Sequence, residues 1–127
     1  GAACRNQVLL ENCTIYSGAD ATRDLNRLFR FNSDPQSVEI RNNIFAGPNK
    51  NKTITPGYSD YKYLNFSNNN YITSDMKIGN KKFVEIVQLE QTSDDIFVDP
   101  ANGDFHIKSG AGFAGEGNAG DPRWWKK

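Results

Sequence analysis

The chain has 127 residues, of which 37% are hydrophobic, and its 15 acidic and 15 basic side chains cancel. This length predicts one domain with a hydrophobic core of its own. The balanced charge gives no electrostatic reason to bind nucleic acid or an anionic membrane surface, so neither is expected as a partner. No apolar run approaches the roughly 20 residues that span a bilayer, and we therefore expect no membrane-spanning segment.

The same strand pattern occurs three times in the first part of the chain. The segments are VLLENCTIY at Val8–Tyr16, QSVEIRNNIFA at Gln36–Ala46 and LNFSNNNYI at Leu64–Ile72. In each segment apolar and polar residues alternate, asparagine interrupts the run, and a second apolar stretch follows, which is typical of two strands joined by a bend. The aligned columns are Val8, Val38 and Leu64; Leu10, Ile40 and Phe66; Asn12, Asn42 and Asn68; and Ile15, Phe45 and Tyr71. The asparagine column therefore has spacings of 30 and then 26 residues.

This internal repeat predicts an all-β fold, a parallel β-helix of about three coils. A period of this length without amphipathic helices excludes the helical repeat folds. Stacked coils place equivalent residues about 4.8 Å apart and complete each other's hydrogen bonds, so the apolar columns are expected to form one core. Asparagine tolerates the left-handed backbone of a sharp bend. We expect Asn12, Asn42 and Asn68 to stack there as a ladder of hydrogen-bonded amides.

The remaining segments predict loops and a distinct C-terminal unit. The polar stretch Gly47–Ser59 is expected to form a loop that projects from one face. Asn102-Gly103 lies between two apolar runs, which is a strong signal for a β-hairpin. Ser109–Gly120 contains five glycines, and such a segment can follow a surface closely. We predict a single domain over residues 1–127, with coils and inserted loops at 1–92 and a hairpin and glycine-rich capping segment at 93–127.

Two parts of this C-terminal unit resemble a known family. Phe97–Gly110 reads FVDPANGDFHIKSG and Gly120–Trp124 reads GDPRW. Both are similar to the C-terminal domain of secreted bacterial proteins with the pectate-lyase-like right-handed parallel β-helix, a largely uncharacterised family. Relatives continue with Gly-Ser-Pro-Ala where this chain has the residues 110–113, GAGF. The resemblance implies right-handed coils, a secreted or cell-surface location in a bacterium, and polysaccharide as a partner.

The same resemblance implies a candidate reaction, in which an arginine or lysine base removes a proton from a uronate while acidic residues hold calcium. The candidate bases are Arg41, which stands in a predicted strand beside an asparagine pair, and Arg27, Arg30 and Lys62, which lie near other predicted strands. No column of carboxylates accompanies them, and the aspartates between residues 94 and 104 lack the alternating oxygen ligands of a calcium loop. We therefore assign no catalytic residue, no metal ligand and no cofactor, and calcium stays an alternative.

Aromatic residues give the candidate binding site. Tyr58, Tyr61 and Tyr63 border the predicted projecting loop, and Trp125 follows the glycine-rich segment. A flat aromatic face with a polar edge suits contact with a sugar ring. One tryptophan of the pair at 124–125 is expected instead to cover the end of the solenoid. The predicted glycan contacts are Tyr58, Tyr61, Tyr63 and Trp125.

These patterns favour a non-catalytic C-terminal β-helix module of an exported bacterial polysaccharide-handling protein, which closes the solenoid and contacts glycan. A polysaccharide lyase acting on acidic glycans is the alternative, and an adhesin-like module that binds a protein is a third class. Cys4 and Cys13 are expected as buried thiols, with a disulfide between them as the alternative. Because Val8–Tyr16 is predicted as a complete coil without a preceding cap, we expect its edge to pair with upstream coils or with a second molecule.

Overall fold

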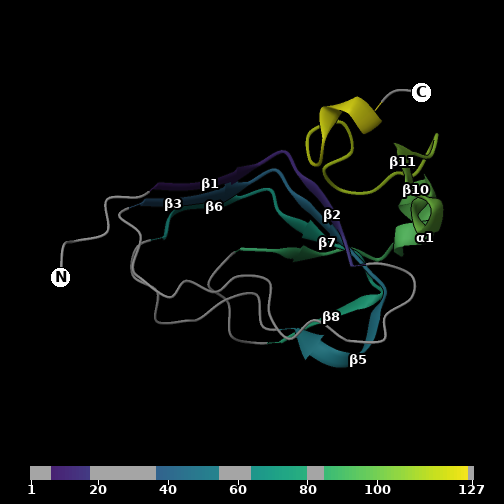
Figure 1. The fold of residues 1–127 in the computed structure, drawn as a ribbon, viewed down its shortest axis with the longest axis horizontal. Coiled ribbons are helices and arrows are strands. Elements are labelled where there is room, and N and C mark those ends of the chain that lie inside the picture. Colours follow the sequence, from purple (N-terminus) through teal and green to yellow (C-terminus); the bar gives the residue numbers. More distant parts are fainter. Residues whose placement is uncertain (1–6, 18–36, 55–63, 80–84, 126–127) are drawn as a thin grey trace.

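The computed structural model describes residues 7–17, 37–54, 64–79 and 85–125, and this part of the chain is predominantly β (Figure 1). Most of its strands belong to three small parallel sheets, whose strands alternate along the chain. The only helices in the described ranges are one α-helical turn and two short 3-10 turns, all in the last third of the sequence. The all-β prediction is therefore confirmed at the level of secondary structure.

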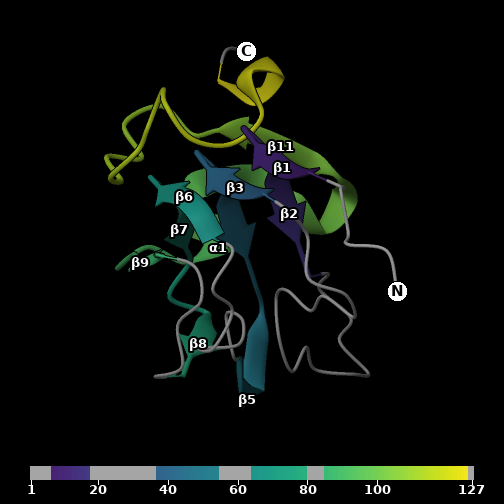
Figure 2. The same ribbon diagram turned by 90° about the vertical axis from the view of Figure 1, so that its left-hand side faces the viewer.

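The first sheet contains the strand that opens each sequence repeat. Its order is β1 (Gln7–Glu11), β3 (Ser37–Arg41) and β6 (Leu64–Asn68), and all pairs are parallel, as Figure 2 shows from the side. Val8, Val38 and Leu64 are aligned as the sequence predicts. An irregularity in β6 then inserts one residue, so Ile40 pairs with Ser67, and the predicted pairing of Ile40 with Phe66 is wrong.

The second sheet contains the strand that follows the bend in each repeat. Its order is β2 (Thr14–Tyr16), β4 (Ile44–Ala46), β7 (Tyr71–Ile72) and β9 (Val87–Gln88), again parallel throughout. Ile15 pairs with Phe45 as predicted, but Phe45 pairs with Ile72, so the assignment of Tyr71 to this column is wrong. The exposed fraction along the column falls from 38% at Ile15 to 2% at Phe45 and 0% at Ile72. Burial therefore deepens away from β2, which is an outermost strand of its sheet.

A third parallel pair lies in a region where the sequence predicted only a loop. β5 (Asn49–Ile54) pairs with β8 (Met76–Ile78), on the side of the molecule opposite β1 and β3 (Figure 1). The stretch NKNKTI has no alternation of apolar and polar residues, which is why its strand was missed. The expectation that all of Gly47–Ser59 is a loop is thus wrong for residues 49–54, and residues 55–63 lie outside the described ranges.

Asparagine forms the bend between the first two sheets in every repeat. Asn12, Asn42 and Asn69 have positive φ angles of 52°, 59° and 54°. This left-handed conformation is accessible to asparagine because its short polar side chain tolerates it better than most side chains do. The third member of the column is Asn69 and not Asn68, because the extra residue in β6 shifts the register by one.

The amide ladder lies one residue after the bend. Asn43 and Asn70 are fully buried, and Nδ2 of Asn43 donates to Oδ1 of Asn70 at 3.0 Å. The remaining groups of the two amides bind backbone: Oδ1 of Asn43 accepts from the amide of Cys13 at 2.9 Å, and Nδ2 of Asn70 donates to the carbonyl of Ile40 at 2.9 Å. The predicted ladder of Asn12, Asn42 and Asn68 is therefore wrong in position, and Cys13 occupies the ladder column in the first repeat.

We predict that Asn43→Leu lowers the free energy of unfolding by roughly 3 kcal/mol, because it removes three hydrogen bonds, a buried one to Asn70 and partly buried ones to the backbone of Leu10 and Cys13. The matched control is Asn42→Gly, which keeps the left-handed backbone and removes only a half-buried side chain. We expect this control to stay within about 1 kcal/mol of the wild type. Urea denaturation of both variants measures the difference. Equal midpoints for the two variants would show that the buried amide is dispensable.

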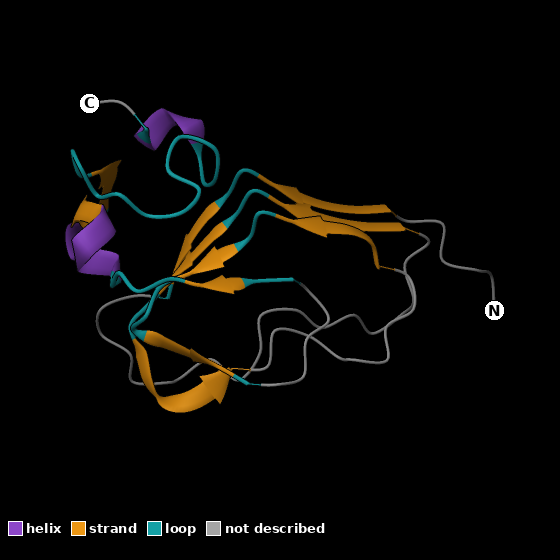
Figure 3. Cartoon of the chain, turned by 180° about the vertical axis from the view of Figure 1, so that it is seen from behind, coloured by secondary structure: helices purple, strands orange, loops and turns teal. Residues whose placement is uncertain are grey.

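The C-terminal third forms a separate layer at one end of the molecule (Figure 3). It begins with α1 (Ser93–Ile96), which Thr92 and Asp95 cap reciprocally, and the hydrogen bonds from Thr92 lower the pKa of Asp95. β10 (Phe97–Asp99) and β11 (Asp104–Ile107) then pair antiparallel around η1 (Pro100–Asn102), which confirms the predicted hairpin. Gly103 carries the positive φ that this turn requires.

This layer buries the outward face of the second sheet. Ile44 and Ala46 of β4 and Leu89 after β9 are at most 5% exposed, although their strands also face the interior of the repeats. They share one apolar cluster with residues of the C-terminal layer, namely Ile96, Phe97, Ile107, Phe113 and Ala119. The protein therefore has a second core outside the parallel strands, and the sequence after residue 92 supplies five of its eight buried members.

The glycine-rich strap, residues 109–121, crosses this sheet in close contact with it. A Cβ on Gly115 would collide with the ring of Tyr71, and one on Gly120 would lie 2.7 Å from Oγ1 of Thr14 and 2.8 Å from Cδ1 of Ile44. The amide of Gly120 donates to the carbonyl of Asn42 at 2.8 Å. Glycine is thus required at these positions because the backbone approaches the sheet more closely than any side chain permits.

We predict that Gly120→Ala destabilises the protein by about 2 kcal/mol more than Gly117→Ala. Both residues have a positive φ, near 80°, so both variants carry the same backbone strain of roughly 1 kcal/mol. Only at Gly120 does the new methyl group meet Thr14 and Ile44, whereas a Cβ on Gly117 has nothing within 4 Å. Thermal or urea unfolding compares the pair, and equal losses would show that the strap does not press on the sheet.

Candidate functional site

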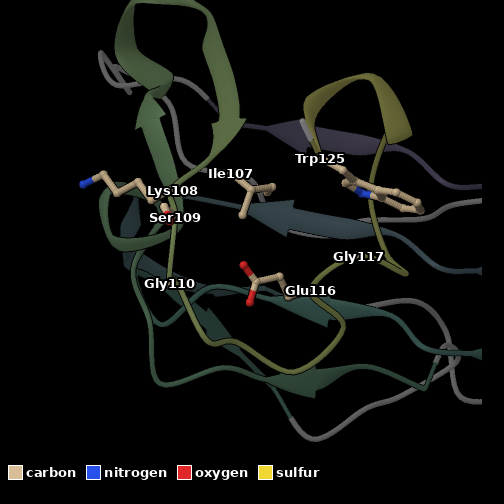
Figure 4. A pocket seen from close by; sticks show the side chains of 7 residues that line it. All are labelled: Ile107, Lys108, Ser109, Gly110, Glu116, Gly117 and Trp125. Atoms are coloured by element: carbon tan, nitrogen blue, oxygen red, sulfur yellow. The ribbon is translucent and has the colours of Figure 1, made fainter. Parts of the chain in front are cut away.

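A pocket of about 410 Å³ opens between the end of the hairpin and the strap. Residues 107–110 form one wall, Glu116 and Gly117 form the opposite wall, and Trp125 borders it on a third side (Figure 4). The lining residues are Ile107, Lys108, Ser109, Gly110, Glu116, Gly117 and Trp125. The lining brings together the apolar side chain of Ile107, the hydroxyl of Ser109, the carboxylate of Glu116 and the ring of Trp125, and such a mixture of apolar and polar groups is found in ligand sites.

Trp125 is the predicted binding residue that the structure places in this pocket. It directly follows η2 (Pro122–Trp124), and its indole Nε1 donates to the carbonyl of Ala119 at 2.9 Å. This bond fixes the ring against the strap and leaves the side chain half-buried. The indole therefore offers a held aromatic surface to the pocket while its polar atom is already satisfied.

Glu116 contributes the carboxylate. Its Oε2 accepts a hydrogen bond from the amide of Gly112 at 3.2 Å, which holds the side chain across the strap. Figure 4 shows the carboxylate directed toward Ile107 and the hairpin wall. In the described part of the chain no donor reaches the other oxygen, Oε1. That oxygen is available to accept hydrogen bonds from a ligand.

Lys108 lines the pocket with its backbone while its ammonium lies elsewhere. Its Nζ donates to the carbonyl of Asp94 at 2.6 Å, and Figure 4 shows the side chain extending away from Glu116. Ser109, next in the chain, is exposed at the pocket mouth. The charge that faces the pocket is therefore the negative charge of Glu116.

The other predicted aromatic contacts do not join this pocket in the described part of the chain. Tyr58, Tyr61 and Tyr63 lie outside the described residues. Trp124 packs edge-to-face against Phe105 and His106, with ring centroids 5.8 Å and 4.9 Å away. The two tryptophans thus differ in their surroundings: Trp125 borders the pocket, and Trp124 packs against the hairpin.

Arg41, the one candidate base of a lyase within the described ranges, is engaged in two ion pairs. Its Nε lies 3.2 Å from Glu11 and its NH1 lies 3.1 Å from Glu39, on the outward face of the first sheet. The hydrogen bond that Arg41 donates to Glu11 raises the pKa of Arg41 further above its usual value. A base must be neutral to accept a proton, and this environment stabilises the charged guanidinium.

We predict that the chain releases no unsaturated product from polygalacturonate, with or without calcium, and that Arg41→Ala does not change this. The ultraviolet absorbance of the unsaturated product measures the reaction directly. Turnover in the wild type that Arg41→Ala abolishes would contradict the interpretation of Arg41 as a surface ion-pair residue.

The acidic residues and cysteine of the described ranges have local roles. Asp104 accepts hydrogen bonds from the amide of His106 at 3.0 Å and lies 2.6 Å from its ring nitrogen Nδ1, and Asp99 accepts from Asn102 at 3.0 Å. These ranges contain no group of three or more side chains arranged to hold a metal ion. Cys13 is a free thiol. Cys4 lies outside the described residues.

Together the small parallel sheets, the antiparallel hairpin and the pocket beside Trp125 define a predominantly β protein with one candidate ligand site. The chain belongs to the family described as Domain of unknown function (DUF5123), whose model matches residues 8–124. No curated protein and no solved structure matches the chain. None of the helices in the described ranges has the length and apolar character needed to cross a membrane.

Proposed function

We propose that the chain is the C-terminal part of a right-handed parallel β-helix in an exported bacterial protein that handles polysaccharide. In this proposal each repeat is one coil of the helix. The parallel pairing of the three sheets supports it, because the strands before the bend pair only with one another and so do the strands after it. The Asn43–Asn70 hydrogen bond supports it further, since a side-chain bond along the stack requires successive coils in register.

The structural part of the proposed role is to cover the outer face of the coils. Ile44, Ala46 and Leu89 would present an apolar strip to solvent if the layer after residue 92 were removed. The hairpin and the strap bury this strip along the side of the stack. Large exposed apolar patches are rare on the surface of monomeric proteins. We therefore propose that the module completes the solenoid by covering its outward apolar residues.

The ligand-binding part of the proposed role is contact with a glycan, and the pocket beside Trp125 is the observation that carries it. A pyranose ring has an apolar face of C–H groups and a rim of hydroxyls. Trp125 supplies a fixed aromatic surface for that face. Glu116 and Ser109 supply hydrogen-bonding groups for the rim. The third class of function, an adhesin-like module that binds a protein, has no comparable support from the described residues.

We predict that Trp125→Ala reduces retention of the protein in native gels that contain a bound polysaccharide, by about tenfold in apparent affinity, because the stacking surface is lost. The matched control is Trp124→Ala, which removes the same ring from the neighbouring residue but does not touch the pocket. Gels containing galactan, xylan, arabinan, β-glucan or polygalacturonate cover the main chemical classes.

The two variants separate binding from folding, because both remove an aromatic side chain that packs on the C-terminal layer. Equal loss with both variants points to loss of structure, and circular dichroism of each variant checks this. Retention that is identical in the wild type and Trp125→Ala, or absent with every polysaccharide, would contradict the glycan contact while leaving the architectural proposal standing.

A further inference from the structure

The pocket carries a charge asymmetry that bears on which sugars it takes. Among its seven lining residues, Glu116 and Lys108 are the only ionisable side chains. The carboxylate of Glu116 faces the hairpin wall across the pocket, whereas the ammonium of Lys108 is 2.6 Å from the carbonyl of Asp94 and points away (Figure 4). Among the residues that the structure describes, a ligand in the pocket therefore meets the negative charge of Glu116 without a lining ammonium directed at it.

Glu116 is also held in place for this encounter. The hydrogen bond from the amide of Gly112 fixes one oxygen, and the other oxygen has no protein donor in the described part of the chain. A carboxylate oxygen accepts well from hydroxyl groups and from ammonium groups. It repels a second carboxylate, and this repulsion is strong when the two lie within a few ångströms in a partly enclosed site.

We infer that this pocket selects neutral or amino sugars over uronic acids, with Trp125 stacking on the ring and Glu116 accepting hydroxyl or ammonium hydrogens. The inference rests on the proposed glycan contact and assigns the chemical class of its ligand. It separates the module from the acidic polymers on which pectate-lyase-like enzymes act. Glu116 is in this view the residue that determines specificity, and Trp125 is the residue that supplies most of the affinity.

The test compares matched neutral and acidic probes by isothermal titration: galactotetraose, its uronate counterpart tetragalacturonate, and chitosan tetramer as the amino sugar. We expect the wild type to bind the chitosan tetramer or galactotetraose at least about tenfold more tightly than tetragalacturonate. Glu116→Gln keeps the shape and removes the charge, so it should weaken binding of the preferred probe and raise affinity for tetragalacturonate about tenfold. Glu90→Gln, an exposed glutamate outside the pocket, is the control for net charge and should change neither affinity.

Lys126 and Lys127 follow Trp125 in the sequence and lie outside the described residues, so the titrations include Lys126→Gln/Lys127→Gln. Stronger binding of tetragalacturonate than of galactotetraose by the wild type overturns the selectivity, whether or not the double variant removes it. Selectivity that Glu116→Gln leaves unchanged overturns the role of Glu116. Both results leave the glycan contact intact, provided that Trp125→Ala weakens binding. No binding of any probe overturns the glycan contact and this inference together.

Discussion

The repeats depend on placing polar amides inside an apolar interior at the second and third bends. A chain that turns sharply next to its own core must bring backbone N–H and C=O groups out of water, and each needs a partner. Asn43 and Asn70 meet this need from within, because each side chain binds backbone of a neighbouring repeat and the two bind each other. In the described residues no buried side-chain nitrogen or oxygen lacks a hydrogen bond. The ladder therefore fixes the register of both sheets at once, because a strand of the first sheet ends just before each buried asparagine and a strand of the second sheet begins just after it.

The outer layer follows from a second constraint, the apolar residues that the same strands direct outward. Ile44 alternates with Phe45 along β4, so one side chain enters the interior and the other needs an external cover. The strap provides this cover only because glycine allows backbone contact at Gly115 and Gly120. The candidate pocket is a by-product of that path: where the strap leaves the sheet and turns toward Trp125, a space remains beside the hairpin. The strap thus covers the sheet and also forms one wall of the proposed binding pocket.

Much of the fold follows from the sequence, and the errors have identifiable causes. The parallel columns that begin with Val8 and Val38 and the hairpin at Gly103 were predictable, because alternation and turn chemistry are local signals. The ladder was misplaced by one residue at Asn43 and by two at Asn70, because the second and third bends carry consecutive asparagines and the inserted residue in β6 shifts the register further in the third repeat. Such an insertion leaves no trace in a single sequence when its neighbours are chemically alike.

The candidate site was predictable only in part. Trp125 stands out as an aromatic residue after a glycine-rich segment, but nothing local relates it to Ser109 or Glu116. Their proximity is set by the path of the strap, a tertiary feature that depends on contacts with Tyr71 and Ile44. The helix at residues 93–96 did have a signal that was overlooked: Thr92 is followed three residues later by Asp95, the spacing of a capping box.

The strap has a consequence for how the chain reaches its native state. In most stacked-repeat proteins each unit contacts only its neighbours, so folding starts at any unit and spreads. Here Asn12 donates to the carbonyls of Asn118 and Gly120, across separations of 106 and 108 residues, and Asp121 donates its amide to Thr14. These contacts tie the first repeat to the last-synthesised part of the described chain. The first repeat gains its final restraint only after that segment has left the ribosome, and folding of such long-range contacts is correspondingly slow and cooperative.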